Sequence, residues 1–395
     1  MKTGEEQKYL LTGATGFLGS HIMAALLQKG TGLCVAGRPS GNEPLKERIR
    51  KLLAWFGIDH LIGLIQFYET DFLKVRLGLG EVEYEDLCNK GLTIIHCASD
   101  TSFTERDRER VMKSNVQSLS EILNFACKSN TPYFHFISTA FAAGTDLVDC
   151  TESPVISDHF TNVYEESKAQ AEKIISGKCN REGIPYTIMR PSIIYGDSVT
   201  GRSIKFNALY VPVRSLQAIR DIYLADIKKN NGLKAAECGI YMNEEGILHL
   251  PLKIFIPCEG SINLIPVDYF TAIVLKILKK PESGTIYHIT GKNPENLERL
   301  AVYTQKFLDI KGIDVIIGHP GPEETRNPAE ELFDHFIKPY IPYISDRRIF
   351  IRNNTDKATP GVLPPDLSYE IFQRCMDFAV SVDWGKNLFS SEISE

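Results

Sequence analysis

A glycine-rich segment near the start of the chain limits the fold more strictly than any other feature of the sequence. Residues 12–19 read TGATGFLG, directly after a short apolar run and directly before a stretch with helical character. Glycines at this spacing permit a tight turn, bring backbone N–H groups close to a pyrophosphate and let a helix pack closely on a strand. The N-terminus of that helix would place its partial positive charge on the phosphates. The segment therefore predicts a strand, a turn and a helix that bind a dinucleotide through Thr12, Gly13, Thr15, Gly16, Phe17, Leu18 and Gly19.

Runs rich in β-forming residues alternate with helical patterns through the first half of the chain. The predicted strands lie at residues 8–12, 32–36, 64–68, 92–97, 132–138 and 185–190. The predicted helices between them lie at residues 17–29, 43–56, 105–129 and 163–177. This alternation is typical of a parallel sheet with helices on both faces. We therefore expect an α/β fold built on a doubly wound, Rossmann-type parallel sheet.

The alternation ends after Tyr195. The later segments include an apolar run from Leu248 to Ile256, a helix after Asp268, a strand near 285–290 and a helix from about 295. The segment 330–395 is rich in proline and aromatic residues and is too apolar for a disordered tail.

This change of pattern predicts two domains. A dinucleotide-binding domain that carries the catalytic residues is expected over residues 1–197, and a smaller, mixed α/β lobe that binds the substrate over residues 198–395. The strand and helices near 263–310 are expected to pack back on the first domain, and the C-terminal segment is expected to close over the substrate side.

Composition and charge exclude several classes of protein. The 395-residue chain has a net charge of −6 and its lysines and arginines are scattered, so no positive field is present to attract nucleic acid. None of the nine cysteines has a CxxC or Cys/His spacing suited to zinc, so we expect no metal and reduced thiols in a cytoplasmic compartment. The polar N-terminus shows no signal-peptide pattern, and no run of about 18 or more apolar residues predicts a transmembrane segment.

The end of the second predicted strand indicates which dinucleotide is bound. A sheet of this type that binds NAD usually carries Asp or Glu about 20 residues after the glycines, where it bonds the ribose 2′-OH. Here residues 35–40 read VAGRPS, and the first acidic residue is Glu43. The guanidinium of Arg38 could instead clasp a 2′-phosphate with two hydrogen bonds. We therefore predict NADP (NADPH) as the cofactor, the alternative for Arg38 being a solvated surface side chain.

Further cofactor residues are expected along the same edge of the sheet. Asp71 follows the third predicted strand, where it could accept a hydrogen bond from the adenine amino group or could cap the next turn. The remaining predicted cofactor residues are Phe72, Cys97, Ala98, Ser99, Asn115, Pro191, Ser192 and Ile193.

A tyrosine and a lysine one helical turn apart are the candidate catalytic pair. Tyr164 and Lys168 lie at positions i and i+4 of a predicted helix and hence on one face. A tyrosine hydroxyl with a pKa of about 10 is a poor acid or base at neutral pH unless a neighbouring cation favours its phenolate. Lys168 supplies that cation and could also bind the nicotinamide ribose.

A pair of hydroxyl residues ends the fifth predicted strand. A hydroxyl at the carboxyl end of a strand points into the crevice where doubly wound sheets bind ligands. Thr139 could hydrogen-bond a substrate carbonyl oxygen while Tyr164 donates its proton. Ser138 could do so instead, or could satisfy backbone groups.

Four motifs in this order resemble the extended short-chain dehydrogenases/reductases over about residues 8–290. They are TGATGFLG, the STA stretch that begins at Ser138, YEESK from Tyr164 to Lys168, and RPSIIYG from Arg190 to Gly196. Within that superfamily the chain most resembles thioester-reductase and fatty acyl-CoA reductase domains, of the male-sterility NAD-binding type. The pieces that carry this closer resemblance read HCAS at 96–99, FTNVYE at 160–165 and NLIPVD at 263–268.

The resemblance implies an activity. Thr139 corresponds to the catalytic hydroxyl of these families, and the expected reaction is the NADPH-dependent reduction of an acyl thioester to an aldehyde or alcohol. No adenylation or carrier domain is recognisable in the sequence, so the acyl group is expected on coenzyme A or on a separate acyl carrier protein. An NADP-dependent ketone or alcohol dehydrogenase would use the same residues.

Two other functions fit the residues less well. Dehydratases of this fold carry an acidic residue after the strand hydroxyl, where this chain has Ala140, and sugar-nucleotide enzymes usually carry an Asn where it has Ile193 and Ile194. A nucleotide-sugar epimerase or dehydratase is therefore disfavoured. A non-catalytic NADP-binding sensor would typically lack the Tyr or the Lys, and both are present.

The chain downstream of the catalytic helix is apolar and aromatic, which favours a hydrophobic carbonyl substrate because an acyl chain needs an apolar wall. The residues that motivate this expectation are Ile193, Ile194, Phe206, Leu209, Tyr210, Val211, Phe255, Ile256, Tyr340 and Tyr343.

Overall fold

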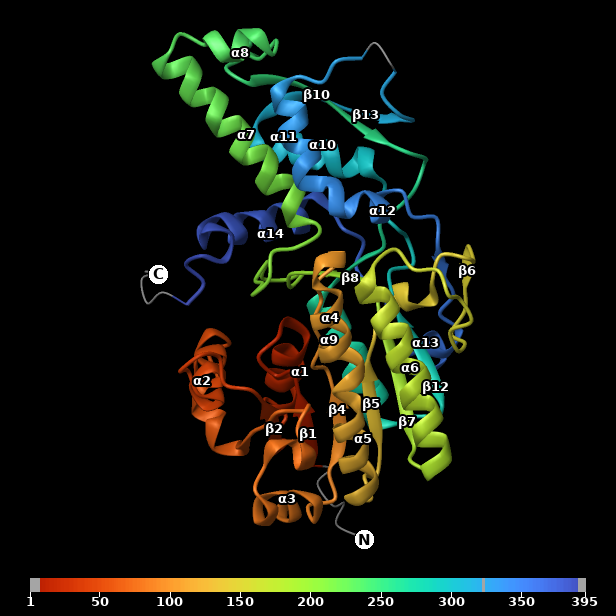
Figure 1. The fold of residues 1–395 in the computed structure, drawn as a ribbon. Helices are drawn as coiled ribbons and strands as arrows, with labels where there is room; N and C mark the ends of the chain where they lie inside the picture. Colours follow the sequence, from red (N-terminus) through yellow and green to blue (C-terminus); the bar gives the residue numbers. More distant parts are fainter. Residues whose placement is uncertain (1–7, 322–323, 390–395) are drawn as a thin grey trace. The chain divides into compact units, whose positions relative to one another are not determined.

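A seven-stranded parallel sheet forms the centre of the larger part of the molecule (Figure 1). The computed structural model describes residues 8–321 and 324–389. The strand order is β12-β7-β5-β4-β1-β2-β3. The strands are β1 (Tyr9–Thr12), β2 (Leu33–Gly37), β3 (Ile65–Glu69), β4 (Thr93–His96), β5 (Phe134–Ile137), β7 (Tyr186–Pro191) and β12 (Thr285–Ile289). The predicted doubly wound sheet is confirmed, and the predicted strands agree with these bounds to within a residue or two.

Helices cover both faces of this sheet, which explains why β1 and β4 are buried along their whole length. On one face, α3, α5 and α6 pack in a common apolar core with residues of the strands, such as Leu10, Ile94 and Phe136. On the other face, α1 packs against α9. These helices are α1 (Phe17–Leu27), α2 (Leu45–Trp55), α3 (Glu81–Cys88), α5 (Leu119–Lys128), α6 (Val163–Glu182) and α9 (Val267–Lys279).

The helix predicted over residues 105–129 is not continuous. It consists of a 3-10 turn η3 (Glu105–Asp107), α4 (Arg108–Met112), a π-helical turn η4 (Lys113–Gln117) and then α5. A π-helical turn accommodates one extra residue and occurs frequently at functional sites. The periodicity of the sequence does not reveal it, because apolar residues continue at helical spacing on both sides.

A second compact unit combines short strands with helices. Its β10 (Leu248–Ile256) pairs in parallel with β13 (Ile310–Ile317) and antiparallel with β9 (Tyr241–Met242), and β8 (Ile193–Tyr195) pairs in parallel with β11 (Leu264–Pro266). Pro251 lies in β10 where the register with β13 shifts, as expected for a residue without a backbone N–H. The helices are α7 (Tyr210–Lys229), α8 (Leu233–Glu237), α10 (Leu297–Leu308), α11 (Pro328–Ile337), α12 (Ile341–Ile344) and α14 (Tyr369–Ser381).

The two compact units are not consecutive in the sequence. Unit 1 comprises residues 1–192, 267–290 and 348–363, and unit 2 comprises residues 193–266, 291–347 and 364–395. The predicted division into 1–197 and 198–395 treated each domain as one continuous stretch of the chain, whereas each unit consists of three segments. The assignment of cofactor binding and substrate binding to these two ranges stays a prediction.

The segment 348–363 belongs to unit 1 through specific pairings. Its β14 (Ile349–Phe350) pairs with β6 (Asp149–Cys150), and α13 (Asn353–Ala358) follows. The Glu152 carboxylate accepts hydrogen bonds from the Thr355 hydroxyl (2.6 Å) and from the backbone N–H of His288 (2.7 Å). One acidic side chain thereby joins α13 to β12. Among the described residues, no helix combines the length and the apolarity needed to cross a bilayer.

Candidate active site

The glycine-rich turn between β1 and α1 depends on close backbone contacts. Gly13 has a φ of +73°, and a Cβ there would lie 2.6 Å from the backbone N of Ala98. A Cβ on Gly19 would lie 2.1 Å from the Gly13 carbonyl oxygen. Gly16 is the N-cap of α1, and a Cβ there would meet only the Gly13 oxygen, at 3.3 Å. Gly13 and Gly19 are therefore needed for packing. Gly16 has no side chain, so nothing at this position covers the backbone N–H groups at the start of α1.

Thr12 joins the ends of β1 and β4. Its buried Oγ1 accepts hydrogen bonds from the backbone N–H groups of Cys97 and Ala98, both at 3.2 Å, and lies 2.9 Å from His96 Nδ1. Burial lowers the pKa of His96 to about 3, so its ring is neutral and accepts the Thr12 proton at Nδ1. Thr12, a predicted cofactor residue, thus uses its hydroxyl to hold the two loops in place.

A cavity of about 460 Å³ lies beside this turn in unit 1. Nine predicted cofactor residues line it: Gly13, Thr15, Gly16, Arg38, Asp71, Phe72, Cys97, Ala98 and Ser99. Phe17, Leu18 and Gly19 lie in α1 just behind the turn and are not among its lining residues.

Arg48 is a lining residue that the sequence analysis missed. It lies on α2, lines the same cavity as Arg38, and its Nη1 donates a hydrogen bond to the Arg38 carbonyl oxygen at 2.8 Å. Two guanidinium groups therefore lie near the end of β2. A basic residue in the first turns of the helix that follows this strand is the signal that could have identified Arg48.

Asp71 caps the turn after β3, which is one of the two roles predicted for it. Its Oδ1 accepts a hydrogen bond from the Leu73 backbone N–H at 3.1 Å, so it caps the turn that follows β3. The carboxylate also lines the cavity, and its bond to an adenine amino group stays a prediction. The ring of Phe72, which also lines the cavity, lies edge-on to the ring of His96 with centroids 6.1 Å apart.

Asn115 joins the loop after β4 to the helix that carries the catalytic pair. Its side chain, in the π-helical turn, accepts from Asp100 N (2.7 Å) and Ser99 Oγ (3.2 Å) and donates to Asp100 O (2.8 Å). Its Nδ2 also donates to Ser167 Oγ at 2.9 Å. All the polar atoms of this predicted cofactor residue therefore bind protein groups, and Asn115 fixes α6 relative to the cavity wall at Ser99.

The N-terminal cap of α6 places Tyr164 in the first turn and Lys168 in the next. Asn162 Oδ1 accepts a hydrogen bond from Glu165 N, and Glu165 Oε2 accepts one from Thr161 N, both at 3.1 Å. Asn162 at the N-cap and Glu165 at the third helical position are the residue types that start helices in this way. The catalytic candidates therefore stand on a well-anchored helix end.

Lys168 is buried at the end of β5. Its Nζ donates a hydrogen bond to the Ile137 carbonyl oxygen at 2.6 Å and lies 4.3 Å from the ring centroid of Phe136. Burial lowers the pKa of Lys168 to about 8, and the charges of Cys97 and Glu172 oppose that shift. The ammonium group is thus held next to the strand end that carries Ser138 and Thr139.

Tyr164 lies within hydrogen-bonding reach of Thr139. Burial raises the pKa of the Tyr164 hydroxyl well above its usual value, as do the charges of Cys97 and Glu165, while the hydrogen bond with Thr139 lowers it. The phenol is therefore protonated at neutral pH and is suited to donate a proton. Cys97 lines the cavity, and its charge influences the pKa of both Tyr164 and Lys168, neither of which is among the lining residues.

Ser138 has a different environment from Thr139. Its Oγ donates a hydrogen bond to Glu172 Oε1 at 2.5 Å, and Glu172 forms a fully buried ion pair with Arg190. The Thr139 Oγ1 accepts from Phe141 N at 3.4 Å and is the hydroxyl next to Tyr164. This geometry favours Thr139 over Ser138 as the group that would contact a substrate carbonyl.

Arg348 is a positioning residue that sequence reasoning did not identify. Its Nη1 donates to the carbonyl oxygens of Phe141 (3.4 Å) and Gly144 (3.0 Å), in the turn that follows Thr139. The same atom lies 3.7 Å from Glu165 Oε2, next to Tyr164. Arg348 thus holds the turn after Thr139 and the start of α6 together, although 207 residues separate it from Phe141.

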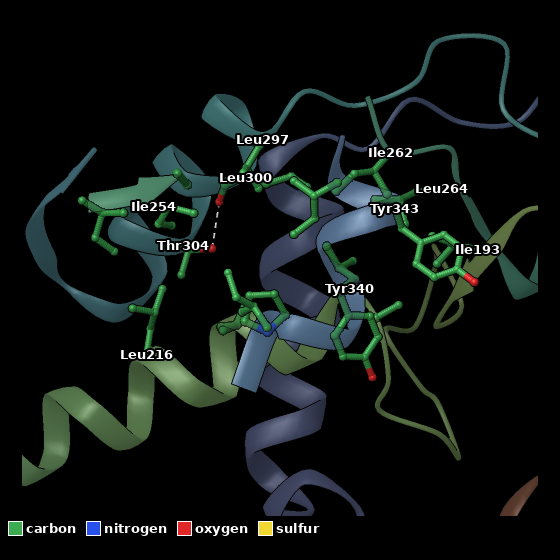
Figure 2. Close-up of a pocket in the computed structure, with 18 of the residues that line it drawn as sticks. Ile193, Leu216, Ile254, Ile262, Leu264, Leu297, Leu300, Thr304, Tyr340 and Tyr343 are labelled. Atoms are coloured by element: carbon green, nitrogen blue, oxygen red, sulfur yellow. Dashed lines mark hydrogen bonds between the residues drawn. The ribbon is translucent and has the colours of Figure 1, made fainter. Parts of the chain in front are cut away.

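The last predicted cofactor residues follow β7. Pro191 ends the strand, and the Ser192 backbone N–H donates to Ile289 O at 3.1 Å. The Ser192 hydroxyl is buried and has no hydrogen-bond partner within residues 8–321 and 324–389. Ile193 begins β8 in unit 2, where it lines an apolar cavity (Figure 2). Within the described parts of the chain, no cluster of three or more His, Cys, Asp or Glu side chains could hold a metal ion.

Comparison with known proteins places this chain in a family. The profile of the family described as male sterility protein matches residues 11–274. Iterative polyketide synthase afoE of Emericella nidulans is 26% identical over 368 residues, which cover 84% of this chain and 12% of the synthase. The chain therefore corresponds to a small part of that relative's length.

Two solved structures have the same fold. The terminal R domain from the myxalamid PKS-NRPS biosynthetic pathway matches with a TM-score of 0.74 and 22% identity, over 97% of this chain and 93% of the other. UDP-glucuronic acid 4-epimerase from Bacillus cereus, in complex with NAD, matches with a TM-score of 0.65 and 15% identity, over 97% of this chain and 100% of the other. At these identities the likeness establishes the fold alone.

Proposed function

Because the chain belongs to the male sterility protein family of extended short-chain dehydrogenases/reductases, we propose that it is an NADPH-dependent reductase of acyl thioesters. The observation that carries this proposal is the pairing of Tyr164 with Thr139 beside the buried ammonium group of Lys168. Cys97, whose charge influences the pKa of Tyr164 and of Lys168, lines a cavity built on the glycine-rich turn.

The residues of this cavity fit a dinucleotide phosphate. Gly16 leaves the N-terminus of α1 uncovered, so its backbone N–H groups can receive a pyrophosphate. Arg38 and Arg48 add two guanidinium groups to the lining of the cavity, and these are the donors best suited to bind a 2′-phosphate. NADPH bound there would supply the hydride that reduces the carbonyl carbon.

The chain's own residues would stabilise the charge that this reduction creates. Hydride attack on a thioester carbonyl leaves an oxyanion, towards which the hydroxyls of Thr139 and Tyr164 can both donate hydrogen bonds. Tyr164 donates its proton, and the Lys168 ammonium group makes the phenol a stronger acid by stabilising its phenolate. When the intermediate collapses, its hydroxyl returns the proton to the Tyr164 phenolate and the C–S bond breaks, so that a thiolate leaves and an aldehyde remains.

A thioester is favoured over other carbonyl compounds because similar chains occur in synthases. The relative in Emericella nidulans is a polyketide synthase, and the similar solved structure is a terminal R domain of a PKS-NRPS pathway. We infer that the acyl group comes on coenzyme A or on a separate acyl carrier protein. A reducing compartment such as the cytoplasm fits the nine cysteines, which are all free.

The deciding experiment is NADPH oxidation measured against a panel of acyl-CoAs, aldehydes, ketones and a UDP-sugar. Turnover of acyl-CoAs with release of free thiol supports the proposal. NADPH oxidation confined to ketones would assign the chain as a dehydrogenase. Because an epimerase or dehydratase consumes no net NADPH, conversion of the UDP-sugar is followed by chromatography, and conversion of that compound alone would assign the chain to this class.

Arg38 is expected to determine the preference for NADPH. The wild-type protein should bind NADPH at least about tenfold more tightly than NADH, because a lost bidentate phosphate contact costs on the order of 1.5–3 kcal/mol. Arg38→Ala should remove most of that preference in a fluorescence titration. Arg50→Ala is the matched control, since Arg50 lies on α2, which follows the loop that carries Arg38, but pairs with Glu47 and does not line the cavity. Equal affinities for NADPH and NADH in the wild type would refute the assignment.

Turnover is expected to decrease as the pH rises through about 8. The pKa of Lys168 is about 8, so its side chain is an ammonium group below that pH and neutral above it. Reduction needs the protonated Tyr164 with a cation beside it, and the raised pKa of Tyr164 keeps the phenol protonated across this range. The Lys168→Arg variant keeps its positive charge above pH 8, so its turnover should not decrease there, whatever its overall rate. A wild-type profile that stays flat from pH 7 to about 9.5 would contradict this role of Lys168.

A further inference from the structure

We propose that Arg348 is a positioning residue that acts on Tyr164 from the C-terminal part of the chain. It fixes the turn that follows Thr139, and it supplies a positive charge to the buried carboxylate next to Tyr164. The inference rests on the proposed function, because the task assigned to Arg348 is to keep Tyr164 an effective proton donor. The segment 348–363 is then a part of the active site that lies outside the four motifs of the sequence.

Arg348 holds the turn after Thr139 through two carbonyl oxygens. Thr139 is the N-cap of the 3-10 turn η5 (Ala140–Ala143), and its Oγ1 accepts a hydrogen bond from the backbone N–H of Phe141 at 3.4 Å. Arg348 Nη1 donates to the carbonyl oxygen of the same Phe141 at 3.4 Å and to that of Gly144 at 3.0 Å. Its guanidinium carbon also lies 4.8 Å from the centroid of the Phe141 ring. Loss of Arg348 would therefore free Phe141, the residue whose backbone fixes the Thr139 hydroxyl.

Glu165 brings a negative charge into the interior directly beside Tyr164. Burial raises the pKa of Tyr164, and the charges of Cys97 and Glu165 raise it further, which makes the phenol a weaker proton donor. The Glu165 side chain is 0% exposed, and its Oε2 lies 3.7 Å from Nη1 of Arg348, which is itself 6% exposed. In an interior of low dielectric constant, a cation at this distance offsets much of the effect of the carboxylate. Arg348 therefore limits how far Glu165 weakens Tyr164 as an acid.

The neighbouring charged side chains have partners of their own. On α6, Glu166 pairs with Arg108 of α4 at 2.8 Å, the Lys168 ammonium group donates to Ile137 O at 2.6 Å, and Glu172 pairs with Arg190 at 2.6 Å. Arg348 by contrast faces Glu165. Cys97, in the loop after β4, influences Tyr164 as well, but burial raises the pKa of its thiol to about 11, so it is neutral at neutral pH. Glu165 is thus the negative charge beside Tyr164 that Arg348 balances.

The effect of removing Arg348 should depend on pH. Without the cation, a carboxylate as buried as that of Glu165 takes up a proton more readily, because burial disfavours its charged form. In Arg348→Met, Glu165 should therefore be largely protonated at about pH 6 and charged at about pH 8. The kcat of this variant, as a ratio to that of the wild type, should fall as the pH rises and reach about one tenth at about pH 8. The ratio removes the titration of Lys168, which both proteins share.

Three further variants separate the charge of Arg348 from its packing. Arg348→Lys keeps a cation, so its ratio should not depend on pH. The double variant Glu165→Gln/Arg348→Met removes both charges and should also lose the pH dependence, while the amide oxygen of Gln can still accept the hydrogen bond from Thr161 N. Arg347→Met is the matched control and should equal the wild type at every pH, because Arg347 is exposed and its Nε donates to Glu259 O. A loss of equal size at every pH, which neither Arg348→Lys nor the double variant changes, would show a purely structural role and overturn the inference.

The rates are measured with an acyl-CoA and with an aldehyde, so that this inference and the proposed function can fail separately. A wild type that reduces the aldehyde but no acyl-CoA rejects the thioester proposal, and the aldehyde series then decides the role of Arg348. If neither compound is reduced, the proposed function is rejected and urea unfolding, followed by circular dichroism, decides the pairing.

In that unfolding series, Arg348→Met should lose stability relative to the wild type as the pH rises, because its folded state holds the Glu165 proton more tightly than its unfolded state does. The double variant should show no such trend. Arg348→Gln, whose amide can still donate to Gly144 O without a charge, replaces Arg348→Met if the latter fails to fold. A difference in urea midpoint that stays constant with pH would overturn the pairing.

Discussion

Replacing Tyr164 with Phe is expected to lower kcat by about 10²-fold or more while leaving the affinity for NADPH nearly unchanged. The substitution removes the hydroxyl that is hydrogen-bonded to Thr139 and keeps the ring, which packs 6.0 Å from the ring of Phe103 between centroids. The oxyanion formed by hydride transfer would then lose its proton donor. Thr139 would remain to hydrogen-bond it, so a residual rate should persist.

The measurement is the single-turnover oxidation of NADPH with a saturating acyl-CoA, alongside NADPH titration by fluorescence. Tyr186→Phe is the matched control, because Tyr186 lies on β7 of the same unit and is not among the residues of the site. Near-full activity of Tyr164→Phe would require the catalytic assignment to be withdrawn. An equal loss in NADPH affinity would show that the hydroxyl serves cofactor binding instead of proton transfer.

The parts of the site that the sequence predicted are those that short-range chemistry determines. Gly13 and Gly19 are recognisable because only glycine fits where a Cβ would meet backbone atoms at 2.6 Å and 2.1 Å. Tyr164 and Lys168 are recognisable because a helix brings positions i and i+4 to one face. The strands are recognisable because a parallel sheet covered on both faces requires continuous apolar runs.

The parts that the sequence did not predict depend on contacts between distant segments. Arg348 is an ordinary arginine in the sequence, and its contact with Phe141 and Gly144 exists only because β14 pairs with β6. The choice between Ser138 and Thr139 likewise depends on Glu172, whose carboxylate binds the Ser138 hydroxyl from a neighbouring helix. Neither contact follows from residue type or spacing.

The network around Glu172 explains how the end of β5 is held. Arg190 Nε donates to both oxygens of Glu172, at 3.0 and 3.2 Å, and the two side chains are 1% and 3% exposed. Arg190 Nη1 lies 3.3 Å from Nε2 of His288, whose Nδ1 lies 2.8 Å from Ile351 O. Burial and the charge of Arg190 lower the pKa of His288 to about 3, so its neutral ring donates from Nδ1 and accepts from Arg190 at Nε2. The chain of hydrogen bonds therefore joins β5, α6, β7, β12 and the segment 348–363.

Glu172→Ala is therefore expected to destabilise unit 1 by about 3–5 kcal/mol, because it leaves the Arg190 guanidinium buried without its carboxylate. The double variant Glu172→Leu/Arg190→Met should recover most of that loss, since it removes both charges from the interior and replaces them with apolar side chains. Glu182→Ala is the matched control on the same helix: its exposed pair with Lys178, 3.6 Å apart, should contribute less than about 1 kcal/mol.

Trp55 of unit 1 and Trp384 of unit 2 are the two tryptophans of the chain, so a Trp384→Phe background lets Trp55 fluorescence report the urea unfolding of unit 1 alone. A loss for Glu172→Ala no greater than that for Glu182→Ala would mean that the buried pair does not hold the strand end in place, and that Ser138 and Thr139 are positioned by backbone contacts alone.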